Sequence, residues 1–135
     1  GIEAALETLT EEIADEPGLT TSFARKGPKP QLGKTVETAL YRVLQEALTN
    51  AVKHSGARRI DVTLETDKKE TVLKVRDNGK GLAADQLETT KGIGLVGMRE
   101  RLVQCGGHLD IQSVEGKGAT IIARVPSTGL KKLEK

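Results

Sequence analysis

Two polar residues, Glu46 and Asn50, lie four positions apart beside an apolar helical pattern. Residues with this spacing lie one above the other on a helix, and neither belongs to the apolar stripe. An asparagine carbonyl oxygen suits a hard cation such as Mg²⁺, and a glutamate can order a water molecule or accept a proton. The pair therefore predicts either a metal-and-base site or an ordinary solvated helix face.

A second polar group, Asp-Asn-Gly-Lys-Gly, follows an apolar strand pattern and begins at Asp77. The strand period of two places this aspartate on the same face as Leu73 and Val75. If that face is the core side, the carboxylate needs a hydrogen-bond donor, and the exocyclic amine of adenine is a suitable one. Gly79 and Gly81 would let the backbone approach the base, although Asp-Asn-Gly is also common turn chemistry.

Glycines at positions 92, 94 and 97 spell G-x-G-x-x-G, the pattern of dinucleotide-binding folds. That pattern requires a preceding strand, and the polar stretch 83–91 makes a poor one, so we reject a Rossmann fold. The segment also lacks the lysine and hydroxyl residue of a P-loop. A glycine-rich loop that leads into a helix still presents free N–H groups and a helix dipole, both of which favour phosphate.

The spacing of apolar residues along the chain predicts the helices and strands that position these polar segments. Helical spacing predicts a helix that ends before Pro17, a second with an apolar stripe from Leu40 to Ala51, and a third whose apolar face runs from Leu95 to Val103. Alternation predicts strands at 19–25, 59–65, 71–76, 108–114 and 119–125. The segment 116–120, Gly-Lys-Gly-Ala-Thr, is by itself a hairpin turn. Early helices and later hairpin-type strands predict an α+β fold, a two-layer sandwich with helices on one face of a mixed sheet.

Composition narrows the function classes. The 135 residues suit one domain, which we place at 1–130, with 131–135 as a frayed tail. The net charge of +2 and the two aromatic residues, Phe23 and Tyr41, predict no nucleic-acid partner and no direct membrane contact. One cysteine excludes an internal disulfide and fits a reducing compartment. We therefore expect a cytoplasmic domain, whose parent could still be an integral membrane sensor.

Taken in order, the four segments resemble the nucleotide-binding boxes of the gyrase, heat-shock chaperone, histidine kinase and MutL superfamily. The resemblance covers the chain from Leu40 to Val125. Residues 46–54 resemble the N box, residues 77–81 and 92–95 resemble the two glycine boxes, and residues 116–120 resemble the last box. This resemblance implies a Bergerat-type ATP-binding fold.

A closer resemblance is to the histidine kinase subfamily that includes the nitrate sensors. Residues 41–50 and 94–101 carry its flanking signatures. That subfamily has a short ATP lid without a phenylalanine box. Only Leu82 to Lys91 separate the two glycine boxes here, and no Phe lies among them. Gyrase and chaperone relatives usually have a longer segment, so the short lid favours the kinase.

The resemblance implies the residues that hold the phosphates. Asn50 would ligate the Mg²⁺ that bridges the phosphates of ATP, and Glu46 would act on water or on the acceptor's proton. Lys53 would neutralise phosphate charge, with His54 as a second candidate.

The resemblance also implies the residues that hold the base and close the lid. Asp77 would bind the adenine amine, and Thr120 would support it through water. The remaining nucleotide-binding candidates are Asn78, Gly79, Gly81, Gly92, Gly94 and Leu95.

The implied function is the phosphate-donor half of a sensor histidine kinase. The chain has two histidines, His54 and His108, and neither lies in the helical context of a phosphoacceptor. The acceptor histidine would then lie on a separate dimerisation domain, with a response regulator downstream, and the domain alone would have little activity. A self-contained ATPase switch of the gyrase or MutL type, an anti-sigma-factor-type serine kinase and a non-catalytic binding module stay open as alternatives.

Overall fold

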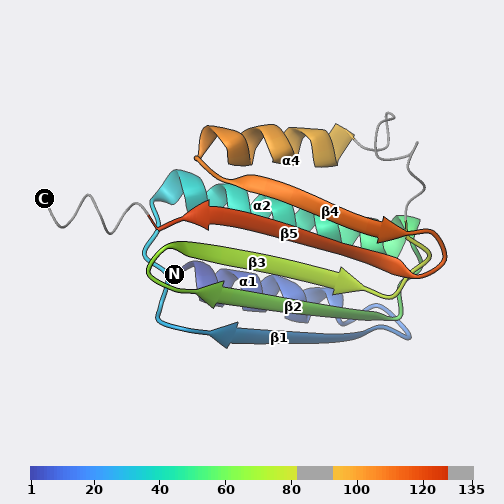
Figure 1. Cartoon of the computed structure of the whole chain (residues 1–135). Coiled ribbons are helices and arrows are strands. Elements are labelled where there is room, and N and C mark those ends of the chain that lie inside the picture. The colour runs from blue at the N-terminus through green and yellow to red at the C-terminus, as the bar shows by residue number, and fades with distance from the viewer. Residues whose placement is uncertain (82–92, 128–135) are drawn as a thin grey trace, which may run out of the picture.

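A single five-stranded sheet with helices on one side makes up the part of the chain that the computed structural model describes, residues 1–81 and 93–127 (Figure 1). The helices are α1 (Ile2–Ile13), α2 (Lys34–Thr49), the π-helix η1 (Asn50–His54) and α4 (Ile93–Gln104). The strands are β1 (Thr20–Lys26), β2 (Arg59–Thr66), β3 (Glu70–Asp77), β4 (His108–Val114) and β5 (Gly118–Pro126). No helix within these ranges is both long and apolar enough to cross a bilayer.

The strand order is β1-β2-β3-β5-β4. β1 and β2 run parallel, and every other neighbouring pair is antiparallel. α1 packs on α2 and β1, whereas α4 packs on α2 and on β4, the edge strand. The prediction of a two-layer α+β sandwich with a mixed sheet and helices on one face is confirmed.

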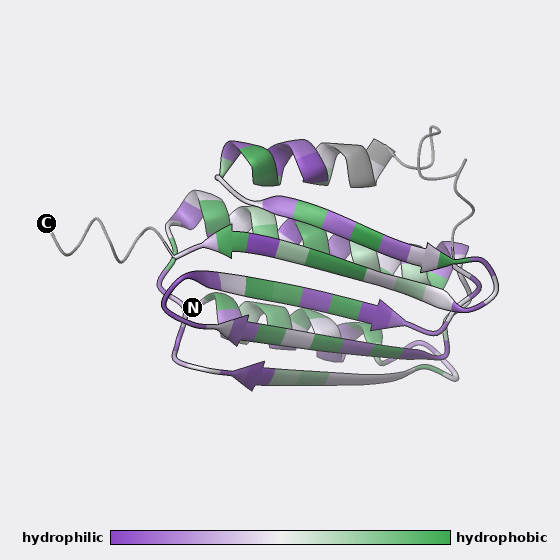
Figure 2. Ribbon diagram, in the orientation of Figure 1, coloured by the Kyte–Doolittle hydropathy of each residue, from purple (hydrophilic) through white to green (hydrophobic). Residues whose placement is uncertain are grey.

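The core lies between the helices and one face of the sheet, and the strands alternate in hydropathy as Figure 2 shows. On α2 the buried residues recur every three or four positions, which is the predicted apolar stripe. In α4, Met98 and Leu102 are buried as predicted, but Val103 is 59% exposed. The assignment of Val103 to the apolar face was wrong, because one further residue turns about 100° around a helix.

The helix that carries the N box does not stay α-helical to its end. At Asn50 it becomes the π-helix η1, and the N–H of Ser55 donates to the carbonyl of Asn50 over 3.0 Å. Each π-type hydrogen bond spans five residues, so the last turn is wider than an α-helical turn. The apolar stripe from Leu40 to Ala51 lies within this helix, which begins earlier, at Lys34, and the pattern carried no signal for the wider turn.

A glycine allows β5 to begin directly against the end of β3. Gly118 has φ +99°, and a Cβ there would overlap the carbonyl oxygen of Asp77 and come within 3.1 Å of the Asn78 Cα. Gly116, in the same turn, also has positive φ (+85°), but nothing lies within 4 Å of its would-be Cβ. Substitution of Gly116 therefore tests the effect of positive φ alone, whereas substitution of Gly118 tests positive φ together with steric overlap.

We expect Gly116→Ala to lower the free energy of unfolding by about 1–2 kcal/mol through its positive φ alone. Gly118→Ala should cost a further ~1–3 kcal/mol, because the added methyl group also overlaps β3. Urea denaturation of both variants measures the difference. Equal losses would show that the contact between β3 and the β4–β5 turn is not tight.

Candidate functional site

The four sequence segments meet at one end of the sheet. β3 ends there at Asp77 and β5 begins at Gly118, while η1 ends and α4 begins on the helical side (Figure 1). These connections follow directly from the topology, because β3 and β5 are antiparallel neighbours. Polar residues from separate parts of the sequence, such as Asn50 and Asp77, are thereby gathered at one end of the sheet.

The side chain of Asp77 lies on the core face, as its strand phase predicted. The residue is 8% exposed and pairs with Ala119 across the β3–β5 ladder. Burial removes water from the carboxylate and raises the pKa of Asp77 above 3.8, while hydrogen bonds from the N–H groups of Gly79 (2.8 Å) and Ala119 oppose that rise. A carboxylate in this position keeps unused acceptor capacity that a ligand amine can satisfy.

Asn50 brings a second buried polar group to this end of the sheet. It is 7% exposed, and its Nδ2 has no hydrogen-bond partner among the described residues. A buried N–H donor without a partner is costly, so Nδ2 suits a ligand that presents an acceptor oxygen, while the carbonyl Oδ1 of the same side chain has the chemistry to ligate a cation. No group of three or more His, Cys, Asp or Glu side chains could hold a metal elsewhere in the described ranges. The alternative of an ordinary solvated helix face does not apply to Asn50.

The Glu46 carboxylate lies against the beginning of α4. A Cβ built on Gly94 would overlap this carboxylate and come within 2.7 Å of its Oε1. The N-terminus of a helix carries free N–H groups and a partial positive charge, which favour a carboxylate. Only glycine leaves room for Glu46 in this position, so the structure brings these two predicted site residues together.

Gly79 and Gly81 are required by contacts within the protein. A Cβ on Gly79 would come within 2.5 Å of the Ser55 carbonyl oxygen, and a Cβ on Gly81 within 2.6 Å of the Val114 carbonyl oxygen. The Ser55 carbonyl also accepts the N–H of Lys80 over 2.9 Å. The sequence-based argument explained these glycines by approach to the base and did not identify Ser55, whose only signal was its position after the N box.

Asn78 has a structural role that the sequence-based argument missed. Its Oδ1 accepts the backbone N–H groups of Arg58 (2.9 Å) and Arg59 (2.8 Å), which fixes the start of β2. The nucleotide-binding role of Asn78 stays a prediction, although its acceptor oxygen is already used by the protein.

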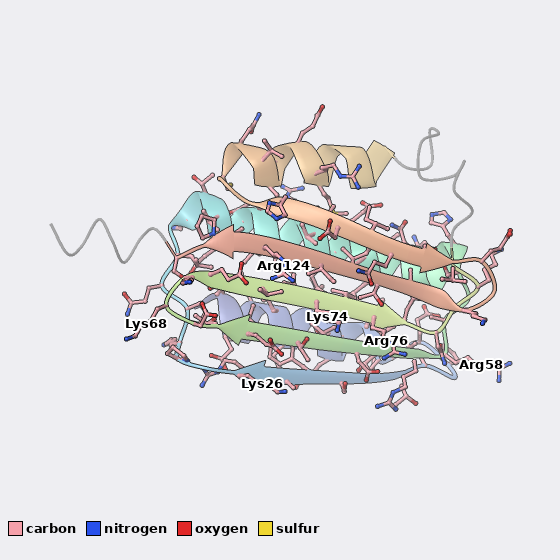
Figure 3. All side chains as sticks on the ribbon, viewed as in Figure 1. Lys26, Arg58, Lys68, Lys74, Arg76 and Arg124 are labelled. Atoms are coloured by element: carbon pink, nitrogen blue, oxygen red, sulfur yellow. The ribbon has the colours of Figure 1, made fainter. Side chains whose placement is uncertain are left out.

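Thr120 does not reach the carboxylate that it was predicted to support. In the β3–β5 register it pairs with Arg76, on the face of the sheet opposite to the helices. Arg76 is labelled on that face in Figure 3. The prediction for Thr120 was wrong by one position: Ala119 pairs with Asp77, and its backbone N–H makes the contact. The contact with the Asp77 carboxylate was expected from the Thr120 side chain, but the backbone N–H of Ala119 makes it.

Of the remaining residues predicted for the site, some are exposed and the others lie outside the described part of the structure. Lys53 and His54 are exposed in η1, beside Asn50. Gly92, the lid segment 82–91, the side chain of Leu95 and the tail 131–135 lie outside the described part of the structure. The nucleotide-binding roles predicted for these residues stay predictions.

Comparisons with known proteins agree with this geometry. The family "Histidine kinase-, DNA gyrase B-, and HSP90-like ATPase" matches residues 35–129. The chain is 36% identical over 95% of its length to the histidine-protein kinase/phosphatase DegS of Brevibacillus brevis. It is 43% identical over 70% of its length to the sensor histidine kinase LiaS of Bacillus subtilis. It spans 33% and 26% of these two relatives.

A solved structure supports the fold. The histidine kinase domain of a blue-light activated kinase from Erythrobacter litoralis superposes on 98% of this chain with a TM-score of 0.77, and this chain covers 64% of that one. At 18% identity this similarity concerns the fold alone. The curated relatives are kinases, so they favour neither the self-contained ATPase nor the serine kinase alternative. The chain thus belongs to the histidine kinase-, DNA gyrase B-, and HSP90-like ATPase family, as an ATP-binding domain of the kind found in sensor histidine kinases.

Proposed function

We propose that this domain binds ATP together with Mg²⁺ and donates the γ-phosphate to a histidine on a separate domain of its parent protein. One observation carries the proposal: a buried carboxylate, Asp77, has two backbone donors and capacity left for an amine. The buried, unpartnered amide of Asn50 lies at the same end of the sheet. The two groups have the chemistry to bind the base and the phosphate–metal end of one nucleotide.

The division of roles follows from the charge of each group. Asp77 accepts the adenine amine, and Asn50 ligates the Mg²⁺ that neutralises the phosphates. Lys53, exposed beside Asn50, would neutralise phosphate charge, with His54 as a second candidate. Glu46, held at the N-terminus of α4, is the candidate base or water-orienting group. Phosphoryl transfer needs little covalent chemistry from the protein, so positioning and charge neutralisation would suffice.

The acceptor and the downstream partner are also part of the proposal. His54 belongs to the N box, and His108 is an exposed residue that opens β4. His54 ends the N-box helix beside the proposed phosphate site, and His108 lies in a strand, so we place the acceptor histidine on a dimerisation domain and a response regulator downstream of it. We further propose a cytoplasmic location and membership of the nitrate-sensor-type subfamily, on the short lid and its flanking signatures.

Calorimetric titration with a non-hydrolysable ATP analogue, with and without Mg²⁺, tests the proposed nucleotide site. Asp77→Asn should weaken binding about 10–100-fold in both conditions, because a hydrogen bond to a charged group is lost. Asn50→Ala should remove the additional affinity that Mg²⁺ confers and leave the metal-free affinity nearly unchanged. Wild-type affinity in Asp77→Asn would refute the adenine assignment, and an intact Mg²⁺ effect in Asn50→Ala would refute the metal role.

The titration of Asp77 should respond to the nucleotide. Its pKa lies above 3.8 in the folded domain, so its contribution to stability is full below pH 3.8 and is lost as the pH rises through the raised value. An amine that donates to the carboxylate favours the charged form, so the bound analogue should lower this pKa. Carboxyl-carbon NMR measures both values. The exposed Asp67, whose pKa is lowered by the N–H groups of Glu70 and Lys69, is the internal control and should not change.

The placement of Glu46 can be tested through stability. Gly97→Ala, on the open side of α4, should stabilise the domain by roughly 1 kcal/mol, because alanine is the better helix former. Gly94→Ala should stabilise it less than Gly97→Ala, because the methyl group displaces the Glu46 carboxylate from the beginning of α4. In a Glu46→Ala background the two glycine substitutions should have nearly equal effects. Thermal or urea unfolding that shows equal gains in the wild-type background would disprove the contact.

A further inference from the structure

The face of the sheet opposite to the helices, called the open face below, carries a groove at the end near the β4–β5 turn. The groove has a volume of about 340 Å³, and its polar lining comes from Lys74, Arg76, Gln112, Lys117 and Thr120. A second groove of about 360 Å³ shares Lys74 and continues along the strands. Figure 3 shows Lys74, Arg76 and Arg124 across this face. Asp77 and Ala119 of the proposed nucleotide site also contribute to the lining of the first groove, whereas Lys74, Arg76, Gln112 and Lys117 have no role in that site.

The cations of the first groove lack acidic partners. Lys74, Arg76 and Lys117 are exposed, and none of the three is in an ion pair with another described residue. The one acid among the lining residues that the structure describes is Asp77, which is buried and belongs to the core face. The groove therefore has an uncompensated positive charge.

Two acids of the open face, Asp61 and Glu70, already have partners, whereas Glu65 and Asp110 on the same face are exposed and lie outside the first groove. Asp61 lies opposite Arg76 in the β2–β3 register, but it accepts the Ser22 hydroxyl (2.6 Å) and the Arg59 guanidinium (3.1 Å). Glu70 accepts the Arg124 guanidinium over 2.9 Å. These two acids bind other cations, although Asp61 also interacts electrostatically with Arg76, so the lining of the first groove has an excess of positive charge from Lys74, Arg76 and Lys117.

The groove offers carboxylate-binding groups in a row. Arg76 on β3, Thr120 on β5 and Gln112 on β4 are direct neighbours in the register, so a guanidinium, a hydroxyl and an amide line up across three strands. A guanidinium binds carboxylate in a two-point geometry. Beyond Lys74 the second groove has the half-buried apolar residues Val72 and Ile122, and its charges are balanced because acids and cations both line it. A ligand that follows both grooves must place carboxylates in the first groove and apolar side chains in the second.

We propose that the Lys74–Arg76–Lys117 groove docks an acidic segment of a partner polypeptide, whose carboxylates are bound by these cations. A polypeptide fits better than a small anion, because the cations are spread over β3 and a turn and lead onto an apolar floor. The groove lies directly behind the Asp77–Ala119 pair, on the opposite face of the same two strands. The partner therefore contacts the strands that hold the buried carboxylate, without entering the nucleotide site.

The test uses a fluorescein-labelled peptide of alternating glutamate and valine, followed by anisotropy at physiological ionic strength. Lys117→Glu and Arg76→Gln should each weaken binding about tenfold, the effect of one lost charge-assisted contact. The matched control is Lys68→Glu, an exposed turn lysine on the same side of the molecule but outside both grooves (Figure 3). It carries the same charge change and should alter affinity by less than about twofold, because exposed charges are screened.

Several outcomes would overturn the proposal. Equal weakening by Lys68→Glu would indicate a non-specific charge effect. Competition by inorganic phosphate as strong as that by unlabelled peptide would indicate a small-anion site. Binding of phosphatidylserine vesicles that depends on Lys117, without peptide binding, would indicate a lipid surface. Amide NMR shifts on peptide addition should cluster on β3, β4 and β5, and thermal melting should show that each variant is folded.

Discussion

Direct backbone contact between three chain segments is the constraint on which this site depends. The turn after η1, the end of β3 and the β4–β5 turn touch at Gly79, Gly81 and Gly118, where a Cβ would lie within about 3 Å of carbonyl oxygens of the facing segments. Protein interiors respond to a single added methyl group, so this packing allows little displacement. It places the end of the N-box helix and the end of β3 at a fixed separation, which a two-ended ligand such as a nucleotide requires.

The same contact explains why a charge can be buried beside it. Asp77 is removed from most of the solvent, and burial alone would favour its neutral form. The backbone N–H groups of Gly79 and Ala119 are available to it because the glycine-rich segments bring the main chain close. These two donors partly offset the desolvation and orient the carboxylate. The remaining desolvation cost can be reduced by an amine that donates to the carboxylate. The site is therefore preorganised for the proposed ligand.

The periodicity of apolar residues predicted the helices, the strands and the fold class. It did not predict which residues pair across the strands or which backbone groups make the hydrogen bonds of the site. The inward phase of Asp77 was predictable, because strand alternation is a strict period of two. Thr120 was placed on the wrong face by one residue, because the first residue of a strand after a turn is not determined by apolar alternation. The role of Asn78 as a backbone clamp and the steric role of Gly94 depend on residues distant in sequence, such as Arg58 and Glu46, so no local pattern could show them.

Strand alternation has a further consequence for how this sheet works. Asp77 and Ala119 point toward the helices, and their immediate neighbours Arg76 and Thr120 point to the open face. The pair β3 and β5 thus has the acid Asp77 on its core face and the cations Lys74 and Arg76 on its open face. Only the backbone of the sheet lies between the two sets. A displacement of β3 relative to β5 on one face must move the residues on the other, because both sets share the same ladder of hydrogen bonds.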